Sequence, residues 1–259
     1  MNSSQQIQFS KECPLGGGPQ GDLAIRIARR MGKHQPLHWL VNSTVVFKVK
    51  QRIYLLGGVD ILGGQMSPLD RHWLEEANGK PICVVDLTSK DAARRTQARS
   101  IMVEHFSKLT DSKLVFISER PFRDDVLKAF DNAGAVFLPG GDTEVLLDSL
   151  AEQDLSGVLR ASEIPIVGNS AGALAVCEEV ILTTDADIKT PRVLAGLGLV
   201  SFSIDPHYDS THDMELYELS AGREIYGLPE QSGIISEGRS LEFVGPAWRF
   251  SNGRKERVN

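Results

Sequence analysis

Short apolar runs alternate with segments of helical periodicity along the middle of the chain. The apolar runs are uninterrupted, which is typical of strands buried on both faces of a parallel sheet. The predicted strands cover residues 43–58, 81–87, 113–118, 135–141 and 164–168. The predicted helices cover residues 67–79, 90–109, 123–133, 143–153 and 155–163. This alternation predicts an α/β, doubly wound fold, a mostly parallel sheet with helices on both faces.

After residue 182 the pattern changes. A short strand within 193–210 leads to His207, a helix is expected over 213–227, and 233–245 has the pattern of a β-hairpin. We expect these pieces to complete the same sheet, so residues 46–259 form a single α/β domain. Residues 1–45 are an N-terminal extension with a short helix over 21–32, and the basic tail over 252–259 is expected to be disordered.

Composition narrows the classes of partner. The chain of 259 residues is 41% apolar and 24% charged, with a formal net charge of −6, so we expect neither nucleic acid nor a membrane as partner. Its three cysteines, Cys13, Cys83 and Cys177, form no disulfide framework and no C-x-x-C pair. With no signal-peptide core and no apolar run long enough to span a membrane, a cytoplasmic protein is expected.

One sequence motif indicates a catalytic serine. Residues 168–172, Gly-Asn-Ser-Ala-Gly, match G-x-S-x-G at the junction of a predicted strand and a predicted helix. Such a bend presents the hydroxyl of Ser170 clear of the sheet edge and directs amide groups toward a developing oxyanion. The alternative is an ordinary glycine-rich joint between strand and helix.

A serine nucleophile needs a base and a carboxylate that orients it. His207 follows an apolar strand where the chain leaves the sheet, with His212 as the fallback. The alternative is a loop histidine bonded to Asp205 or Asp209. His72 and His105 lie in helical patterns and are expected in solvent. The candidate carboxylates are Asp185, Asp187, Glu224 and Glu230.

The oxyanion hole needs two donors. The amide of Ala171 follows the candidate nucleophile directly. A second donor is expected from Gly140 or Gly141, in a Gly-Gly turn at another strand end, where backbone can approach a substrate closely.

Five segments together resemble a known family. They are FLPGGDTEVLLDSL from 137, PIVGNSAGALAV from 165, ILTTDAD from 181, IDPHYD from 204 and GREIYGLPE from 222. Their order and spacing resemble the α-aspartyl dipeptidase (dipeptidase E) and cyanophycinase family of serine peptidases over residues 53–245. The resemblance implies a fold like that of the class I glutamine amidotransferases.

The resemblance also implies residue roles. Ser170 matches the nucleophile, His207 the base, and Gly141 with Ala171 the oxyanion positions. Asp185 matches the acid of the dipeptidase branch and Glu230 that of the cyanophycinase branch, so both remain candidates.

The resemblance extends to substrate contacts, which we expect from Arg223, Asn169 and Gly140. Arg223 falls near the arginine that reads a substrate carboxylate in the dipeptidase branch. Asn169 replaces a large aromatic residue, which implies a wider pocket. The segment between His207 and Arg223 departs from the dipeptidase pattern, which leaves selectivity for N-terminal aspartate open.

We therefore expect a serine exopeptidase that hydrolyses a short peptide without metal or organic cofactor, with a homodimer as a further possibility. The alternatives are a β-aspartyl peptidase or amidase on the same scaffold, and a non-catalytic binding protein with this fold. A cysteine-dependent glutaminase is disfavoured, because serine occupies the bend and Cys177 lies two helical turns further on.

Overall fold

The computed structural model describes residues 51–61, 63–118, 123–184 and 188–259. These residues belong to one compact unit. The N-terminal extension predicted over 1–45, with its helix over 21–32, lies outside the described residues.

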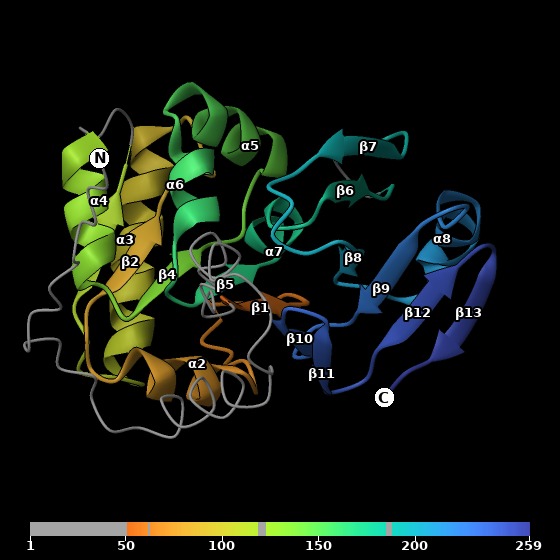
Figure 1. The fold of residues 1–259 in the computed structure, drawn as a ribbon, viewed down its shortest axis with the longest axis horizontal. Coiled ribbons are helices and arrows are strands. Elements are labelled where there is room, and N and C mark those ends of the chain that lie inside the picture. The colour runs from red at the N-terminus through yellow and green to blue at the C-terminus, as the bar shows by residue number, and fades with distance from the viewer. Residues whose placement is uncertain (1–50, 62, 119–122, 185–187) are drawn as a thin grey trace, which may run out of the picture. The chain divides into compact units, whose positions relative to one another are not determined.

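A seven-stranded sheet forms the centre of the molecule (Figure 1). Its order is β11-β10-β1-β5-β4-β2-β3. The strands are β1 (Arg52–Leu56), β2 (Ile82–Val85), β3 (Leu114–Ile117), β4 (Ala135–Leu138), β5 (Ile166–Asn169), β10 (Gly233–Glu237) and β11 (Ser240–Val244). β1 to β5 are parallel, and the hairpin β10–β11 adds antiparallel strands beside β1. The predicted α/β fold with a mostly parallel sheet is confirmed.

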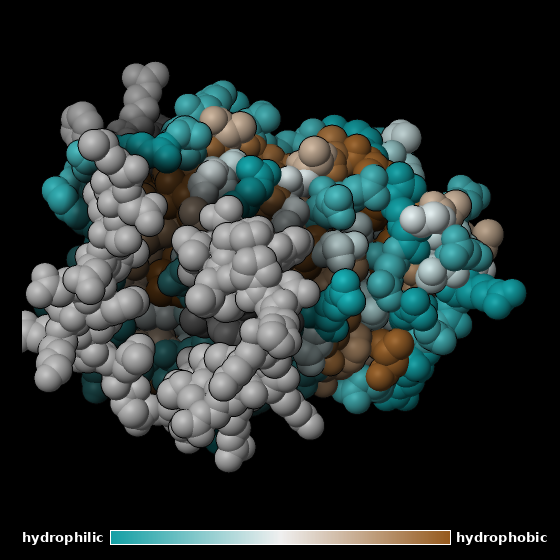
Figure 2. All heavy atoms as spheres, in the orientation of Figure 1, coloured by the Kyte–Doolittle hydropathy of each residue, from teal (hydrophilic) through white to brown (hydrophobic). Residues whose placement is uncertain are grey.

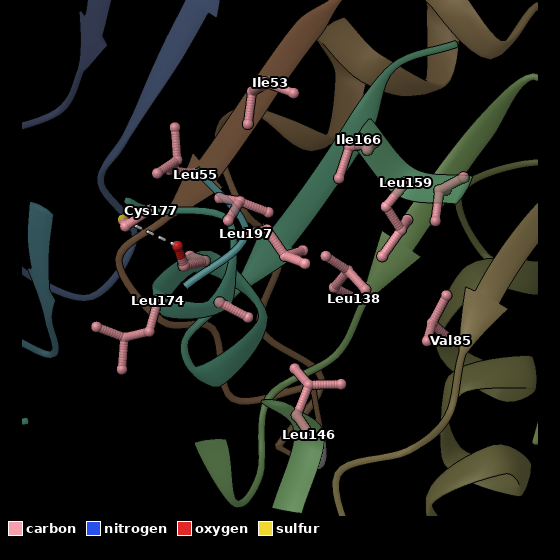
Figure 3. Close-up of a cluster of buried hydrophobic side chains, with 14 of the residues drawn as sticks. Ile53, Leu55, Val85, Leu138, Leu146, Leu159, Ile166, Leu174, Cys177 and Leu197 are labelled. Atoms are coloured by element: carbon pink, nitrogen blue, oxygen red, sulfur yellow. Dashed lines mark hydrogen bonds between the residues drawn. The ribbon is translucent and has the colours of Figure 1, made fainter. Parts of the chain in front are cut away.

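Helices cover both faces of this sheet. On one face lie α2 (Asp70–Ala77) and α3 (Ala92–Ser107); on the other lie α4 (Arg123–Asn132), α5 (Thr143–Glu152), α6 (Leu155–Ala161) and α7 (Ala171–Ala175). Alternate strand residues face opposite sides of the sheet. Ile53 and Leu55 belong to the buried cluster that includes residues of α4 to α7, and Figure 3 shows them in one cluster with Leu146, Leu159 and Leu174. Tyr54 and Leu56 belong to the cluster that includes residues of α2 and α3. Burial on both sides explains the uninterrupted apolar runs.

The C-terminal strands do not all complete the central sheet, which corrects the expectation from sequence. Only β10 and β11 join it. A second sheet has the order β13-β12-β9-β8, and among the described strands β6 pairs with β7 alone. These strands are β6 (Glu179–Leu182), β7 (Arg192–Ala195), β8 (Ser203–Pro206), β9 (Glu224–Leu228), β12 (Trp248–Ser251) and β13 (Arg254–Arg257).

Two further predictions in this region are wrong. The helix expected over 213–227 is α8 (Asp213–Leu219), preceded by the short 3₁₀ turn η2 (Ser210–His212), and residues 224–228 form β9 between β8 and β12. The tail expected to be disordered forms β13, which pairs with β12. β9 receives its hydrogen bonds from β8 and β12, which a local pattern does not report. β13 instead pairs with β12 across the two-residue turn Asn252-Gly253, both with left-handed φ, and this Asn-Gly pair was a local hairpin signal in the sequence.

His105 is a smaller correction. It was expected in solvent, but only 6% of it is exposed, and its ring lies edge-on against Phe106. Burial lowers the pKa of its imidazole. His72, in α2, is exposed as expected.

The surface is largely hydrophilic where it is visible over the C-terminal strands, with small hydrophobic patches between polar residues (Figure 2). Among the described helices, none combines the length and apolar character needed to cross a bilayer.

Candidate active site

The carboxyl ends of several strands open onto one cleft. In parallel sheets this edge is where loops from different strands meet. The cleft has a volume of about 970 Å³. We call it the Ser170 cleft, and its polar lining includes Asp86, Thr88, Gly140, Gly141, Ser170, Thr183, Asp205, His207 and His212.

Ser170 stands at the bend between β5 and α7 with φ 50° and ψ −111°. This left-handed φ is uncommon outside glycine and marks a backbone held under strain. The flanking glycines let the bend close: a side chain on Gly168 would collide with the backbone of α7, and one on Gly172 with the carbonyl of Leu138 in β4. The motif is therefore a tight elbow that holds its serine at the rim of the cleft.

His207 follows β8 directly and reaches the serine. Its Nε2 lies 2.9 Å from Ser170 Oγ, and its Nδ1 lies 3.2 Å from Glu230 Oε1. Its backbone also has a left-handed φ, 54°, and its amide donates to the carbonyl of Gly57 at 2.5 Å. Ser170, His207 and Glu230 thus come together from three distant segments, in the order of hydroxyl, imidazole and carboxylate.

The other carboxylates do not compete for this imidazole within the described residues. Asp205 bonds His212, and Asp209 bonds Thr211, so neither forms the loop pairing considered from sequence. Glu224 bonds Tyr226 and Arg249. Asp185 and Asp187 lie outside the described residues.

Two backbone amides lie near the serine. Gly141 lines the cleft with φ 140°, and Ala171 is the first residue of α7. Within the described part of the chain, neither amide donates to a protein acceptor. Gly140 approaches the serine so closely that a Cβ there would lie 3.4 Å from Ser170 Cβ. This arrangement can present N–H donors to an oxyanion formed next to Ser170.

Two predicted substrate contacts are not brought to the Ser170 cleft. Arg223 lines a separate hollow, where its Nε donates to Glu179 at 2.7 Å. Asn169, the last residue of β5, is only 4% exposed and is not among the residues that line the cleft. Its Nδ2 lies 3.5 Å from the carbonyl of Val59, and its buried Oδ1 has no hydrogen-bond partner among the residues that the structure describes.

Sequence reasoning missed the supporting role of Gly57 and Gly58 after β1. A side chain on Gly58, which has φ 124°, would overlap the ring of His207. The carbonyl of Gly57 accepts from His207, and that of Gly58 accepts from Gln231, next to Glu230. The available signal was the double glycine at the end of an apolar strand, which indicates close approach by another segment.

A second pair beside the catalytic candidates was also missed. His212 Nδ1 lies 2.7 Å from Asp205 Oδ2, and this hydrogen bond raises the pKa of the imidazole, against the opposing effect of burial. The repeated Asp and His residues in DPHYDSTH were the signal, but sequence could not say which pairs form. No cluster of metal-ligating side chains occurs within the described residues.

The sequence matches the model of one protein family and is similar to several known proteins. The model of "Peptidase family S51" matches residues 93–244. A "Probable alpha-aspartyl dipeptidase" from Drosophila melanogaster is 32% identical over 142 residues, 49% of this chain and 58% of that protein. A "Peptidase E" from Nostoc sp. is 33% identical over 129 residues, 44% of this chain and 53% of that protein. The matches thus span little more than half the length of these relatives.

Solved structures share the fold. A peptidase from an acI-B1 Actinobacterium superposes with a TM-score of 0.63 at 15% identity, covering 82% of this chain and 95% of that one. A structure from Listeria monocytogenes EGD-e has a TM-score of 0.56 at 17% identity, covering 81% of this chain and 99% of that one. At these identities the likeness concerns the fold alone.

Proposed function

Because the chain belongs to peptidase family S51, we propose that it is a serine exopeptidase that cleaves short peptides through an acyl-enzyme. One observation carries the proposal: Ser170 Oγ and Glu230 Oε1 lie on opposite ring nitrogens of His207, at 2.9 and 3.2 Å. That is the order a nucleophile, a general base and an orienting carboxylate require. The name of one relative, "Probable alpha-aspartyl dipeptidase", supports a dipeptide-sized substrate.

The reaction follows from this geometry. Ser170 Oγ attacks the scissile carbonyl while His207 Nε2 takes its proton, and the amides of Gly141 and Ala171 hold the oxyanion. His207 then delivers the proton to the departing amine, which leaves an ester on Ser170. Water, activated by the same imidazole, hydrolyses the ester and restores the serine. Glu230 holds the Nδ1 proton throughout and stabilises the imidazolium.

Three further parts of the proposal rest on the sequence. They are a cytoplasmic location, a homodimer, and the lack of nucleic-acid or membrane partners. The selectivity of the cleft for α-aspartyl peptides over β-aspartyl peptides or simple amides is decided by assaying the three side by side.

Ser170→Ala tests the chemistry. We expect hydrolysis to fall by at least about 10³-fold, because removal of the nucleophile of such a triad leaves only binding and oxyanion stabilisation. The unaltered protein should also be labelled stoichiometrically at Ser170 by a fluorophosphonate, with circular dichroism confirming that both proteins are folded. Undiminished hydrolysis by Ser170→Ala would end the proposal. Inertness to both peptide and reagent would favour a binding protein.

A further inference from the structure

Asp205 and His212 form a second carboxylate–imidazole pair at the Ser170 cleft. The side chain of Asp205, in β8, is 1% exposed, and both its oxygens are occupied: Oδ2 accepts from His212 Nδ1 at 2.7 Å and Oδ1 from Thr183 Oγ1 at 2.8 Å. A buried carboxylate with two donors is a rigid support. The mechanism proposed for Ser170 uses none of these three residues, yet all three line its cleft.

The hydrogen bond to Asp205 determines which nitrogen of the His212 ring can bind a ligand. With Nδ1 bonded to Asp205, Nε2 is the remaining ring nitrogen, and among the described residues no acceptor bonds it. The hydrogen bond to Asp205, followed by the charges of Asp209 and Glu215, raises the pKa of His212, so the ring keeps its positive charge at higher pH. In the imidazolium, Nε2 is a charged donor.

The remaining charges of the cleft favour an anionic ligand. Each carboxylate in its described lining already has a donor: Asp86 accepts from Arg99, Glu144 from Arg192, Asp142 from the Val145 amide, and Asp205 from His212. Lys90 adds exposed positive charge to the same lining, whereas the exposed Arg94 lies 3.8 Å from Asp91. Arg223, the cation expected to read a carboxylate, is held by Glu179 elsewhere.

We propose that His212, positioned by Asp205 and Thr183, binds a carboxylate of the peptide substrate and is a specificity-determining residue of this cleft. The inference rests on the proposed function for its substrate class. The carboxylate has two sources, the side chain of the N-terminal residue and the C-terminus of the peptide. Both offer the oxygen acceptors that an imidazolium binds with a charge-assisted hydrogen bond.

The test measures binding without turnover. In the Ser170→Ala background, isothermal titration gives dissociation constants for Asp-Leu, for Asn-Leu, which lacks the side-chain carboxylate, and for Asp-Leu amide, which lacks the terminal one. We expect Asp-Leu to bind at least about tenfold more tightly than one of the two amides, and the weaker amide identifies the carboxylate that is read.

Variants assign that preference to His212. The preference is the ratio of the dissociation constant of the weaker amide to that of Asp-Leu. Adding His212→Gln should bring this ratio close to one, and His212→Arg should restore part of the preference, because the positive charge returns. The matched control is His72→Gln, an exposed histidine outside the Ser170 cleft, which should leave the preference unchanged. Equal binding of all three peptides by the parent, or an unchanged preference in His212→Gln, would overturn the inference.

The pH dependence of the preference separates binding from a structural role. The preference should decline as pH rises through the pKa of His212, and Asp205→Asn should move this decline to lower pH. The charged groups facing His212 within the described residues are Asp205, Asp209 and Glu215, with the ring of Tyr208 packed beside it. Undiminished hydrolysis by Ser170→Ala would count against the serine chemistry, whereas an unaltered preference in His212→Gln would count against the role of His212.

Discussion

The two residues that meet at the centre of the site both have strained backbones. Ser170 and His207 have φ of 50° and 54°, conformations that cost of order 1–3 kcal/mol each in a non-glycine residue. Hydrogen bonds hold both: the Ser170 amide donates to Leu56, and the His207 amide to Gly57. Since the last residue of β1 and the residue that follows it are the two acceptors, one strand end sets the separation of hydroxyl and imidazole. The side chains therefore meet before any substrate arrives.

Single substitutions test which carboxylate orients His207. Glu230→Gln should reduce kcat by about 10²- to 10⁴-fold with little change in KM, because the amide can no longer stabilise the imidazolium. Steady-state kinetics on the same dipeptide gives both constants. Asp185→Asn is the comparison, and Glu104→Gln, an exposed glutamate of α3, is the control for loss of a charge. A larger loss in Asp185→Asn than in Glu230→Gln would assign the role to Asp185.

At the scale of elements, the placement of α7 depends on packing. It has only five residues, all buried, which is too short for a helix to be stable on its own. It packs against β4 and β5, and Gly172 lies against the carbonyl of Leu138. The serine and the first amide of the oxyanion hole are thus held by contact between a helix and a sheet.

Gly172→Ala should therefore disturb fold and activity together. A methyl group facing the Leu138 carbonyl forces α7 outward, and we expect a loss of at least about 1–3 kcal/mol in the free energy of unfolding. Urea denaturation measures it. Gly157→Ala in α6 is the matched control, since open space surrounds that position, and it should stabilise the protein by up to about 1 kcal/mol. Equal stability of Gly172→Ala and the unaltered protein would contradict this account of α7.

At the scale of the whole molecule, the site lies where two sheets contribute to one edge. Ser170 follows a strand of the central sheet, whereas His207 and Glu230 follow β8 and β9 of the second sheet. β13 also contacts the segment that follows His207. Lys255 Nζ in β13 lies 2.8 Å from Asp213 Oδ2, and the hydroxyl of Tyr208 donates to Asp213 Oδ1 at 2.6 Å. The ammonium also lies over the ring of Tyr208.

Lys255→Met should show this long-range support. The substitution keeps much of the apolar stem but leaves the half-buried Asp213 without its cation, and we expect a loss of about 1–2 kcal/mol in the free energy of unfolding by urea denaturation. Lys108→Met removes an exposed pair with Glu104 within one helix and should leave stability almost unchanged. Similar effects of the two substitutions would show that the C-terminal strands do not support the loop through Lys255.

Local pattern was sufficient for the parts of this protein that depend on near neighbours in sequence. The buried strands, their helices and the G-x-S-x-G elbow were predicted, because burial on both faces demands apolar runs and a tight bend demands small residues. The position of His207 after a strand was also predicted, because the apolar run that precedes it marks that strand in the local sequence. The strand over residues 224–228 was not, since β9 depends on hydrogen bonds to β8 and β12.

Tertiary structure alone decided which charged groups meet. Residue types and spacing left four carboxylates open for His207, and only folding places Glu230 beside it while Asp205 turns to His212. It likewise ties Arg223 to Glu179, away from the cleft where it was expected. The physical reason is the same in each case: an ion pair is set by distances of about 3 Å between segments far apart in the chain, and these distances follow from how whole sheets pack.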